Sequence, residues 1–106
     1  LGDKNIVAPR LCDVELEKSE AKKAFESVLK SVETFWDFGI VHADLSEFNI
    51  LWWKFQPYII DFPQSVDRRT HPNPREILDR DLRNIVKYFS RYIDIDSEEI
   101  KKKFDE

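Results

Sequence analysis

A stretch of twenty residues, 42–61, constrains the fold of this chain more than any other feature, and it is called the polar stretch because acidic and amide side chains interrupt its strand-forming residues. It holds two short runs of strand-forming residues separated by three others, and these runs are 50–53 and 57–61. Runs spaced in this way predict a hairpin, whose two ends lie close together. One acid (Asp44), one amide (Asn49) and a second acid (Asp61) stand at those ends. The pattern therefore predicts that three oxygen-bearing side chains converge on one side of the hairpin.

Helical periodicity precedes this stretch. Ser19 is expected to be the N-cap of a long helix, because its hydroxyl can accept a backbone N–H of the first turn. Apolar residues then recur at helical spacing on one face: Ala21, Phe25, Val28, Leu29, Val32, Phe35 and Trp36. Gly39 is well placed to end the helix, because glycine tolerates the left-handed conformation common after a last turn. Ile40 and Val41 then predict a brief strand.

A second helix is predicted after the polar stretch. Asn73 is a strong candidate for its cap, Pro74 suits the first helical position, and Glu76 can reach back toward the cap. The apolar residues that follow again share one face: Ile77, Leu78, Leu82, Ile85, Val86 and Phe89. A last short helix is expected over 98–104, capped by Ser97.

The predicted order is a long helix, a small antiparallel hairpin with a polar loop, a second long helix and a short helix. This order is typical of an α+β fold that is mainly α-helical. The 106 residues are enough for one compact domain and not for two, and 42% of them are hydrophobic. A single packed core is therefore expected.

Composition bears on the compartment and on the partners. The net charge of −4 gives no electrostatic basis for binding of nucleic acid or of an anionic membrane by the chain as a whole. No apolar run reaches the length of a transmembrane helix. Cys12 is the single cysteine, so an internal disulfide framework is excluded and a reducing, cytoplasmic location is expected. The sequence contains no Met and starts with Leu1, which suggests a fragment or a processed piece.

The convergent oxygens define the chemistry open to the polar stretch. They suit Mg²⁺, which is commonly held by one or two carboxylates together with substrate phosphates. A third group is then free to accept a proton from an incoming hydroxyl or to orient it. Asp and Asn are also common as capping residues of turns, and spacing alone leaves the two interpretations even. For His42, a structural role in holding the loop is favoured over metal ligation, because His71 is the only other histidine.

The spacing His-x-Asp-x-x-x-x-Asn, followed by a strand that ends in Asp, resembles the catalytic loop and the metal-binding Asp of protein kinases. The amino-acid sequence resembles the RIO family of atypical kinases over nearly the whole chain. The most similar segments are 41–51, 59–66, 71–73 and 80–84. Two further segments, 8–11 and 13–16, are similar to the Rio1 branch, whereas the sequence of 61–64 is more similar to the Rio2 branch. The branch is therefore left open.

This resemblance implies a role for each residue of the site. Asp44 would be the catalytic carboxylate that faces the acceptor hydroxyl or water. Asn49 and Asp61 would bind Mg²⁺ on the phosphates of ATP. In the family the residue that matches Asp61 is also implicated as the acceptor of a transient phosphate, which makes Asp61 a second catalytic residue. Leu51 and Ile60 would form the floor of the adenine pocket.

The resemblance also implies a fold like the C-terminal lobe of a protein kinase, in which Asp81 anchors the backbone of the catalytic loop. Ser46 stands where protein kinases carry a Lys that contacts phosphate. Only eleven residues (62–72) separate Asp61 from Asn73, too few for an activation loop and a peptide-docking platform. The acceptor is therefore expected to be a large assembly or the kinase itself.

The sequence contains no Gly-rich loop, strand Lys or partner Glu of the kind that a kinase N-terminal lobe supplies to the phosphates. We therefore expect residues 1–106 to form the C-terminal lobe alone, with the N-lobe absent from this chain. Such a piece is expected to bind Mg²⁺-ATP poorly. Its hydrophobic hairpin would be exposed, which favours a homodimer through that surface.

The resulting expectation is ATP- and Mg²⁺-dependent phosphoryl transfer by a serine/threonine kinase or ATPase of RIO type. By the same resemblance, the expected partner is the pre-ribosomal small subunit during its maturation. One alternative is a non-catalytic binding module, derived from a kinase, that docks on a protein or a ribosomal particle. Another is a small metal-dependent hydrolase, which ranks lower because the sequence lacks the clustered histidines that such sites often use.

Overall fold

The computed structural model describes residues 2–3, 6–60 and 65–104. The described part combines two long α-helices and a short one with small two-stranded antiparallel sheets, which confirms the predicted α+β class. The helices are α1 (Lys18–Asp37), α2 (Pro74–Phe89) and α3 (Ser97–Lys102), and short 3₁₀ turns are η1 (Leu11–Asp13) and η2 (Glu47–Asn49). The strands are β1 (Gly2–Asp3), β2 (Ile6–Val7), β3 (Ile40–Val41), β4 (Ile50–Trp53), β5 (Gln56–Ile59) and β6 (Val66–Asp67).

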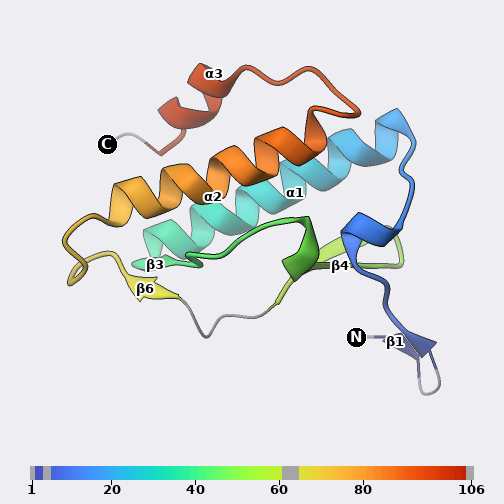
Figure 1. The fold of residues 1–106 in the computed structure, drawn as a ribbon, viewed down its shortest axis with the longest axis horizontal. Helices are drawn as coiled ribbons and strands as arrows, with labels where there is room; N and C mark the ends of the chain where they lie inside the picture. The colour runs from blue at the N-terminus through green and yellow to red at the C-terminus, as the bar shows by residue number, and fades with distance from the viewer. Residues whose placement is uncertain (1, 4–5, 61–64, 105–106) are drawn as a thin grey trace.

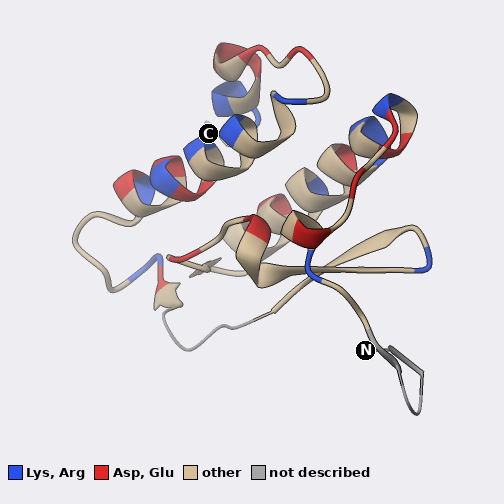
Figure 2. Ribbon diagram, turned by 45° about the vertical axis from the view of Figure 1, so that its right-hand side comes forward, with Lys and Arg blue, Asp and Glu red and all other residues tan. Residues whose placement is uncertain are grey.

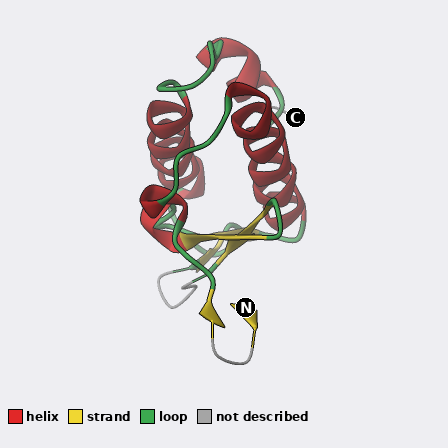
Figure 3. Cartoon of the chain, turned by 90° about the vertical axis from the view of Figure 1, so that its right-hand side faces the viewer, coloured by secondary structure: helices red, strands yellow, loops and turns green. Residues whose placement is uncertain are grey.

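The two long helices lie side by side, with the strands on one side of the pair and α3 on the other (Figures 1 and 3). Their apolar faces meet in one core, as the predicted periodicity requires. The rings of Phe25 on α1 and Phe89 on α2 contact each other with their centroids 5.3 Å apart. Tyr88 packs edge-on against Phe89 at 5.1 Å, and its hydroxyl donates to the backbone oxygen of Leu11 at 3.0 Å. The core thus joins η1 to both helices.

Helix α1 ends where the sequence predicts, but its N-cap differs from the predicted one. The helix begins one residue before Ser19, so the predicted cap is wrong: Glu17 is the N-cap, and its N–H donates to the Glu20 carboxylate at 2.9 Å. The carboxylate of Glu20, at the third helical position, thus reaches back and accepts the backbone N–H of the cap residue. The predicted end is confirmed, because Gly39 follows the C-cap with φ +88°.

The hairpin is formed by β4 and β5, with Ile50 opposite Ile59 and Trp53 opposite Gln56. Its connection has two residues, Lys54 and Phe55, rather than the three predicted. Both have positive φ values, of 49° and 62°, which a tight two-residue turn of this kind requires. The described part of the second strand ends at Ile59, and the predicted end of that run at residue 61 lies outside the described residues.

A second pairing was not predicted from the sequence. Strand β3 pairs with β6, with Ile40 opposite Asp67 and Val41 opposite Val66. Arg68 reinforces the pairing, because its N–H donates to Gly39 O at 2.8 Å and its guanidinium stacks 3.8 Å from the ring centroid of Trp36. The polar stretch is therefore tied to the end of α1 from both sides.

The last two helices begin close to the predicted positions. Asn73 is the N-cap of α2 and Pro74 its first residue, as predicted, although the Asn73 side chain makes no cap hydrogen bond. For α3 the predicted cap is wrong. Asp96, rather than Ser97, accepts the N–H groups of Glu98 and Glu99, at 3.0 and 3.4 Å. None of the described helices is both long and apolar enough to pass through a bilayer.

Candidate active site

The loop 42–49 between β3 and β4 is held first by its own histidine. His42 is 3% exposed, and its Nε2 lies 2.7 Å from the backbone oxygen of Ile60. Its Nδ1 accepts the N–H of Asp44 at 3.2 Å, which leaves the proton on Nε2 to be donated to Ile60. His42 therefore links the start of the loop to the end of the hairpin, and its predicted structural role is confirmed.

A buried carboxylate on α2 holds the next part of the loop. Asp81 is 1% exposed, and its two oxygens accept the N–H groups of Ala43 and Leu45 at 2.8 and 3.1 Å. Ala43 has φ +75°, a conformation that alanine rarely adopts, so the loop needs this anchor. Burial raises the pKa of Asp81, and the two backbone N–H groups only partly offset that rise. The predicted anchoring of the loop by Asp81 is confirmed.

Two further side chains of α2 complete the attachment, and the sequence did not reveal them. The guanidinium of Arg80 donates to the backbone oxygen of Ala43, and Asn84 Nδ2 donates to that of Leu45 at 3.2 Å. Ala43 and Leu45 thus have both their N–H and C=O groups bonded to α2. The available signal was the spacing of residues 80, 81 and 84, which places all three on adjacent positions of one helix face.

The loop turns back so that Asn49 lies beside Asp44. Asn49 Nδ2 donates to the backbone oxygen of Asp44, and Asn49 O accepts the N–H of Ile60 at 2.9 Å. Ser46 stabilises the turn, because its Oγ accepts the N–H of Phe48 at 3.2 Å and caps η2. The Asp44 side chain is exposed. The structure therefore brings together Asp44, Asn49 and Ile60, whereas Asp61 lies outside the described residues.

The two residues predicted to floor an adenine pocket lie near each other on the hairpin. Residues directly opposite in a sheet share a face, and successive residues alternate between faces. Ile50 and Ile59 form a pair that faces the core, so Leu51 and its partner Tyr58 face outward. Ile60 follows Ile59 and is half-buried, as is Leu51. Their role toward a nucleotide stays a prediction.

The orientation of the Asn49 amide fits its predicted role as a magnesium ligand. Its amide nitrogen is already bonded to Asp44 O, which leaves the amide oxygen as the atom available to a cation. Among the described residues, no group of three or more His, Cys, Asp or Glu side chains could hold a metal by itself. A site that uses Asn49, Asp61 and phosphate oxygens is a different arrangement, and it stays a prediction.

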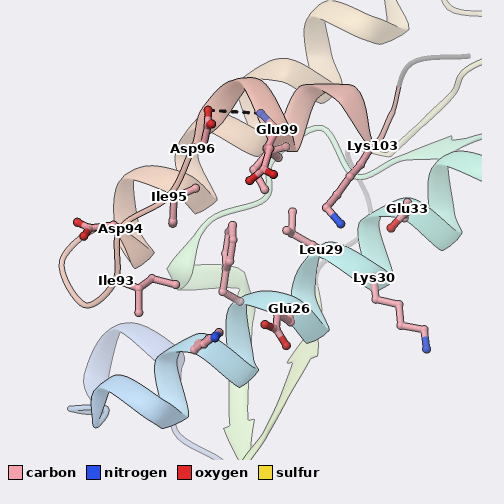
Figure 4. Close-up of a pocket in the computed structure, with 13 residues that line it drawn as sticks. Glu26, Leu29, Lys30, Glu33, Ile93, Asp94, Ile95, Asp96, Glu99 and Lys103 are labelled. Atoms are coloured by element: carbon pink, nitrogen blue, oxygen red, sulfur yellow. Dashed lines mark hydrogen bonds between the residues drawn. The ribbon is translucent and has the colours of Figure 1, made fainter.

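A separate cavity of about 520 Å³ lies between α1 and the segment 93–103. Figure 4 shows its rim of charged side chains, which includes Glu26, Lys30 and Glu99. None of its lining residues comes from the loop 42–49. The cavity therefore takes no part in the candidate active site.

Comparison with known proteins gives a consistent family. Residues 1–102 match the RIO domain family. The serine/threonine-protein kinase RIO3 of Bos taurus is 39% identical over 92 residues, which cover 86% of this chain and 18% of that protein. The RIO-type kinase Rio2 of Methanocaldococcus jannaschii is 39% identical over 80% of this chain and 32% of its own.

A third relative matches over more of both chains than these two do. The RIO-type kinase Rio1 of Thermoplasma acidophilum is 35% identical over 102 residues, 95% of this chain and 52% of that protein. This chain thus spans between about a fifth and about half of the length of these relatives. The family match covers nearly all residues of the chain, and the loop held by His42 and Asp81 agrees with it. The chain therefore belongs to the RIO family of serine/threonine-protein kinases.

Proposed function

We propose that the protein transfers the γ-phosphoryl group of Mg²⁺-ATP to a serine or threonine hydroxyl or to water. The observation that carries this proposal is the loop 42–49, fixed to α2 through Asp81 and folded so that Asn49 contacts the backbone of Asp44. Phosphoryl transfer depends chiefly on positioning and charge stabilisation, so a rigid loop that presents a carboxylate is what the reaction requires.

Each residue of the loop has a distinct task in this proposal. The exposed Asp44 carboxylate accepts the proton of the attacking hydroxyl or orients it. The Asn49 amide oxygen and the Asp61 carboxylate would hold Mg²⁺, which when bound would neutralise charge on the phosphates. Asp61 can also receive the phosphoryl group transiently, in which case the protein acts as an ATPase switch. Leu51 and Ile60 contact the adenine from the outer face of the hairpin.

The chain corresponds to the C-terminal lobe of a protein-kinase-like fold in this proposal. Helix α1, the loop with its hairpin, and α2 follow one another in the order of that lobe. A Gly-rich loop and a Lys that contact the phosphates are not among these 106 residues. Tests of activity therefore need the natural protein, and the 106 residues alone are expected to bind Mg²⁺-ATP weakly.

A second candidate function is a non-catalytic docking module, and the exposed aromatic residues of the hairpin and of η2 favour it. Phe55 is 75%, Phe48 57% and Tyr58 38% exposed. Exposed apolar surface of this kind is typical of contact with another protein. The partners proposed for such a module are a second copy of the chain or, from the family resemblance, the pre-ribosomal small subunit in the cytoplasm.

Magnesium-dependent ATP turnover by the natural protein distinguishes the two functions. We expect Asp61→Ala to abolish turnover, and Asn49→Ala to raise the Mg²⁺ concentration needed for half-maximal turnover by about tenfold or more. Asn73→Ala is the matched control, because that side chain makes no cap hydrogen bond. Turnover that survives Asp61→Ala unchanged would contradict catalysis by this site. No turnover in the wild-type protein would favour the docking module.

A further inference from the structure

One face of α2 carries a row of cations in a chain that is acidic overall. Arg80, Arg83, Lys87 and Arg91 follow one another at intervals of three, four and four residues, while the net charge of the chain is −4. Residues at these intervals lie one above the other on a helix. Arg91 stands just beyond α2, where its N–H still donates to Tyr88 O at 3.3 Å. Figure 2 shows Lys and Arg along this helix.

No acidic side chain of the described residues forms an ion pair with these cations. All four side chains are exposed. In the part of the chain that the structure describes, ion pairs join Arg69 to Asp67 and Arg75 to Asp79, and no ion pair involves a residue of the row. Arg91 is held over the rings of Tyr88 and Tyr92, 5.9 and 6.0 Å from their centroids. Arg80 is already bonded to the loop through Ala43 O, so the cations of the row that are open to an anion are Arg83, Lys87 and Arg91.

The row borders the candidate catalytic loop. Arg80 donates to the backbone oxygen of Ala43, the residue before Asp44. Farther along the helix, a groove of about 440 Å³ separates α2 from η2 and is lined by Glu47, Phe48, Lys87, Tyr88 and Arg91, among others. Among the described residues that line the groove, Glu47 is the one carboxylate, against two cations, so this lining is net positive.

We propose that this groove binds an acidic segment of the phospho-acceptor protein and brings its serine or threonine to Asp44. Lys87 and Arg91 would pair with carboxylates of the segment, and Phe48, which is 57% exposed, would contact an apolar side chain. The proposal rests on the proposed phosphoryl transfer and adds the substrate class. It also supplies a docking surface that the eleven residues 62–72 are too few to build.

An acidic polypeptide fits the groove better than a nucleic acid does. Nucleic-acid binding relies on a broad positive field that neutralises many phosphates. Here four cations lie in one row, and the chain as a whole is acidic. A short segment with two or three carboxylates matches the length and charge of the row.

Binding can be measured on this protein by fluorescence anisotropy. The probe is a labelled twelve-residue peptide with one serine flanked by aspartates and glutamates, compared with neutral and lysine-rich peptides of equal length. We expect the acidic peptide alone to bind, and its affinity to fall as salt is raised from about 50 to 500 mM. Equal binding of the three peptides would overturn the proposal.

The double variant Lys87→Glu, Arg91→Glu tests the residues. We expect it to weaken binding of the acidic peptide about tenfold or more, because two attractions become repulsions. Lys22→Glu, Lys30→Glu on α1 is the matched control, since both lysines are exposed and the change in net charge is the same. It should change the affinity less than about twofold. Equal losses in both variants, or none in either, would overturn the proposal, and circular dichroism establishes that both fold.

Two further measurements separate this proposal from the proposed function. Single-stranded RNA of similar length is titrated in parallel, and RNA that binds more tightly than the acidic peptide through Lys87 and Arg91 would overturn it. In the natural protein the double variant should raise KM for an acidic acceptor more than it lowers kcat. Peptide binding without any phosphoryl transfer would instead contradict the proposed function and leave the groove intact.

Discussion

At the scale of single residues, the buried carboxylate of Asp81 determines the shape of the candidate catalytic loop, residues 42–49. It satisfies two backbone N–H groups, and its neighbours Arg80 and Asn84 satisfy the two carbonyls. A loop without regular structure has few other ways to fix its backbone. The left-handed conformation of Ala43, at φ +75°, is retained because all of these bonds act on it together.

Replacing Asp81 by alanine should therefore destabilise the protein. The change leaves two buried N–H groups without acceptors, at a cost of about 2–4 kcal/mol in the free energy of unfolding. Asp79→Ala on the same helix removes only a partly exposed pair with Arg75 and should cost less than about 1 kcal/mol. Urea denaturation measures both. Equal costs would show that Asp81 is no anchor.

The pKa of Asp81 also gives this contribution a pH dependence. Burial raises that pKa above its ordinary value of 3.8, so the folded state holds the proton more tightly than the unfolded state does. The stability that Asp81 contributes is then greatest below the unfolded pKa and is lost as the pH rises through the folded pKa. Relative to Asp81→Asn, which does not titrate, the wild type should lose stability from about pH 3 upward. A flat difference would contradict the raised pKa.

At the scale of elements, α2 serves the core and the site with adjacent faces. Leu78, Ile85 and Phe89 are buried against the other elements, while Arg80, Asp81 and Asn84 hold the loop. The helix thus transmits the rigidity of the core to the loop 42–49. Helix α3 is shorter, with six residues, and depends more on its cap.

The cap of α3 gives a matched pair of substitutions. Asp96→Ala should reduce the free energy of unfolding by about 1 kcal/mol, because Asp96 accepts the N–H groups of Glu98 and Glu99. Ser97→Ala should change it by less than about 0.5 kcal/mol, because Ser97 lies inside the helix and is exposed. Chemical denaturation of both variants decides between the two caps, and a larger loss for Ser97→Ala would contradict the assignment.

At the scale of the whole molecule, the elements best predicted from the sequence were those in which apolar or strand-forming residues recur over many positions. Both long helices follow from their apolar faces, and the hairpin follows from two strand-forming runs. The pairing of β3 with β6 was missed, because two-residue strands carry no period and the partners lie 25 residues apart (66 − 41). The caps at Glu17 and Asp96 were missed because Ser19 and Ser97 carry the usual capping side chain only a residue or two away.

The site was predictable only in part. The structural role of His42 was predicted because His71 is the only other histidine, and that of Asp81 follows from the family resemblance. Both are confirmed by their hydrogen bonds. Arg80 and Asn84 were missed because their partners are backbone carbonyls, so only their spacing with Asp81 on one helix face indicated a shared role. The roles of Asp44, Asn49 and Asp61 depend on a nucleotide and a metal, so they stay predictions until activity is measured.

The most direct test is the rate of ATP turnover by the natural protein with Asp44→Asn. The amide keeps the shape of the side chain but cannot accept a proton from the acceptor, so kcat should fall by about 100-fold or more. KM for ATP should change little, since Asp44 is not assigned to the nucleotide. Asp37→Asn, exposed at the end of α1, is the control and should keep the wild-type rate. A kcat for Asp44→Asn within about twofold of the wild type would contradict the account.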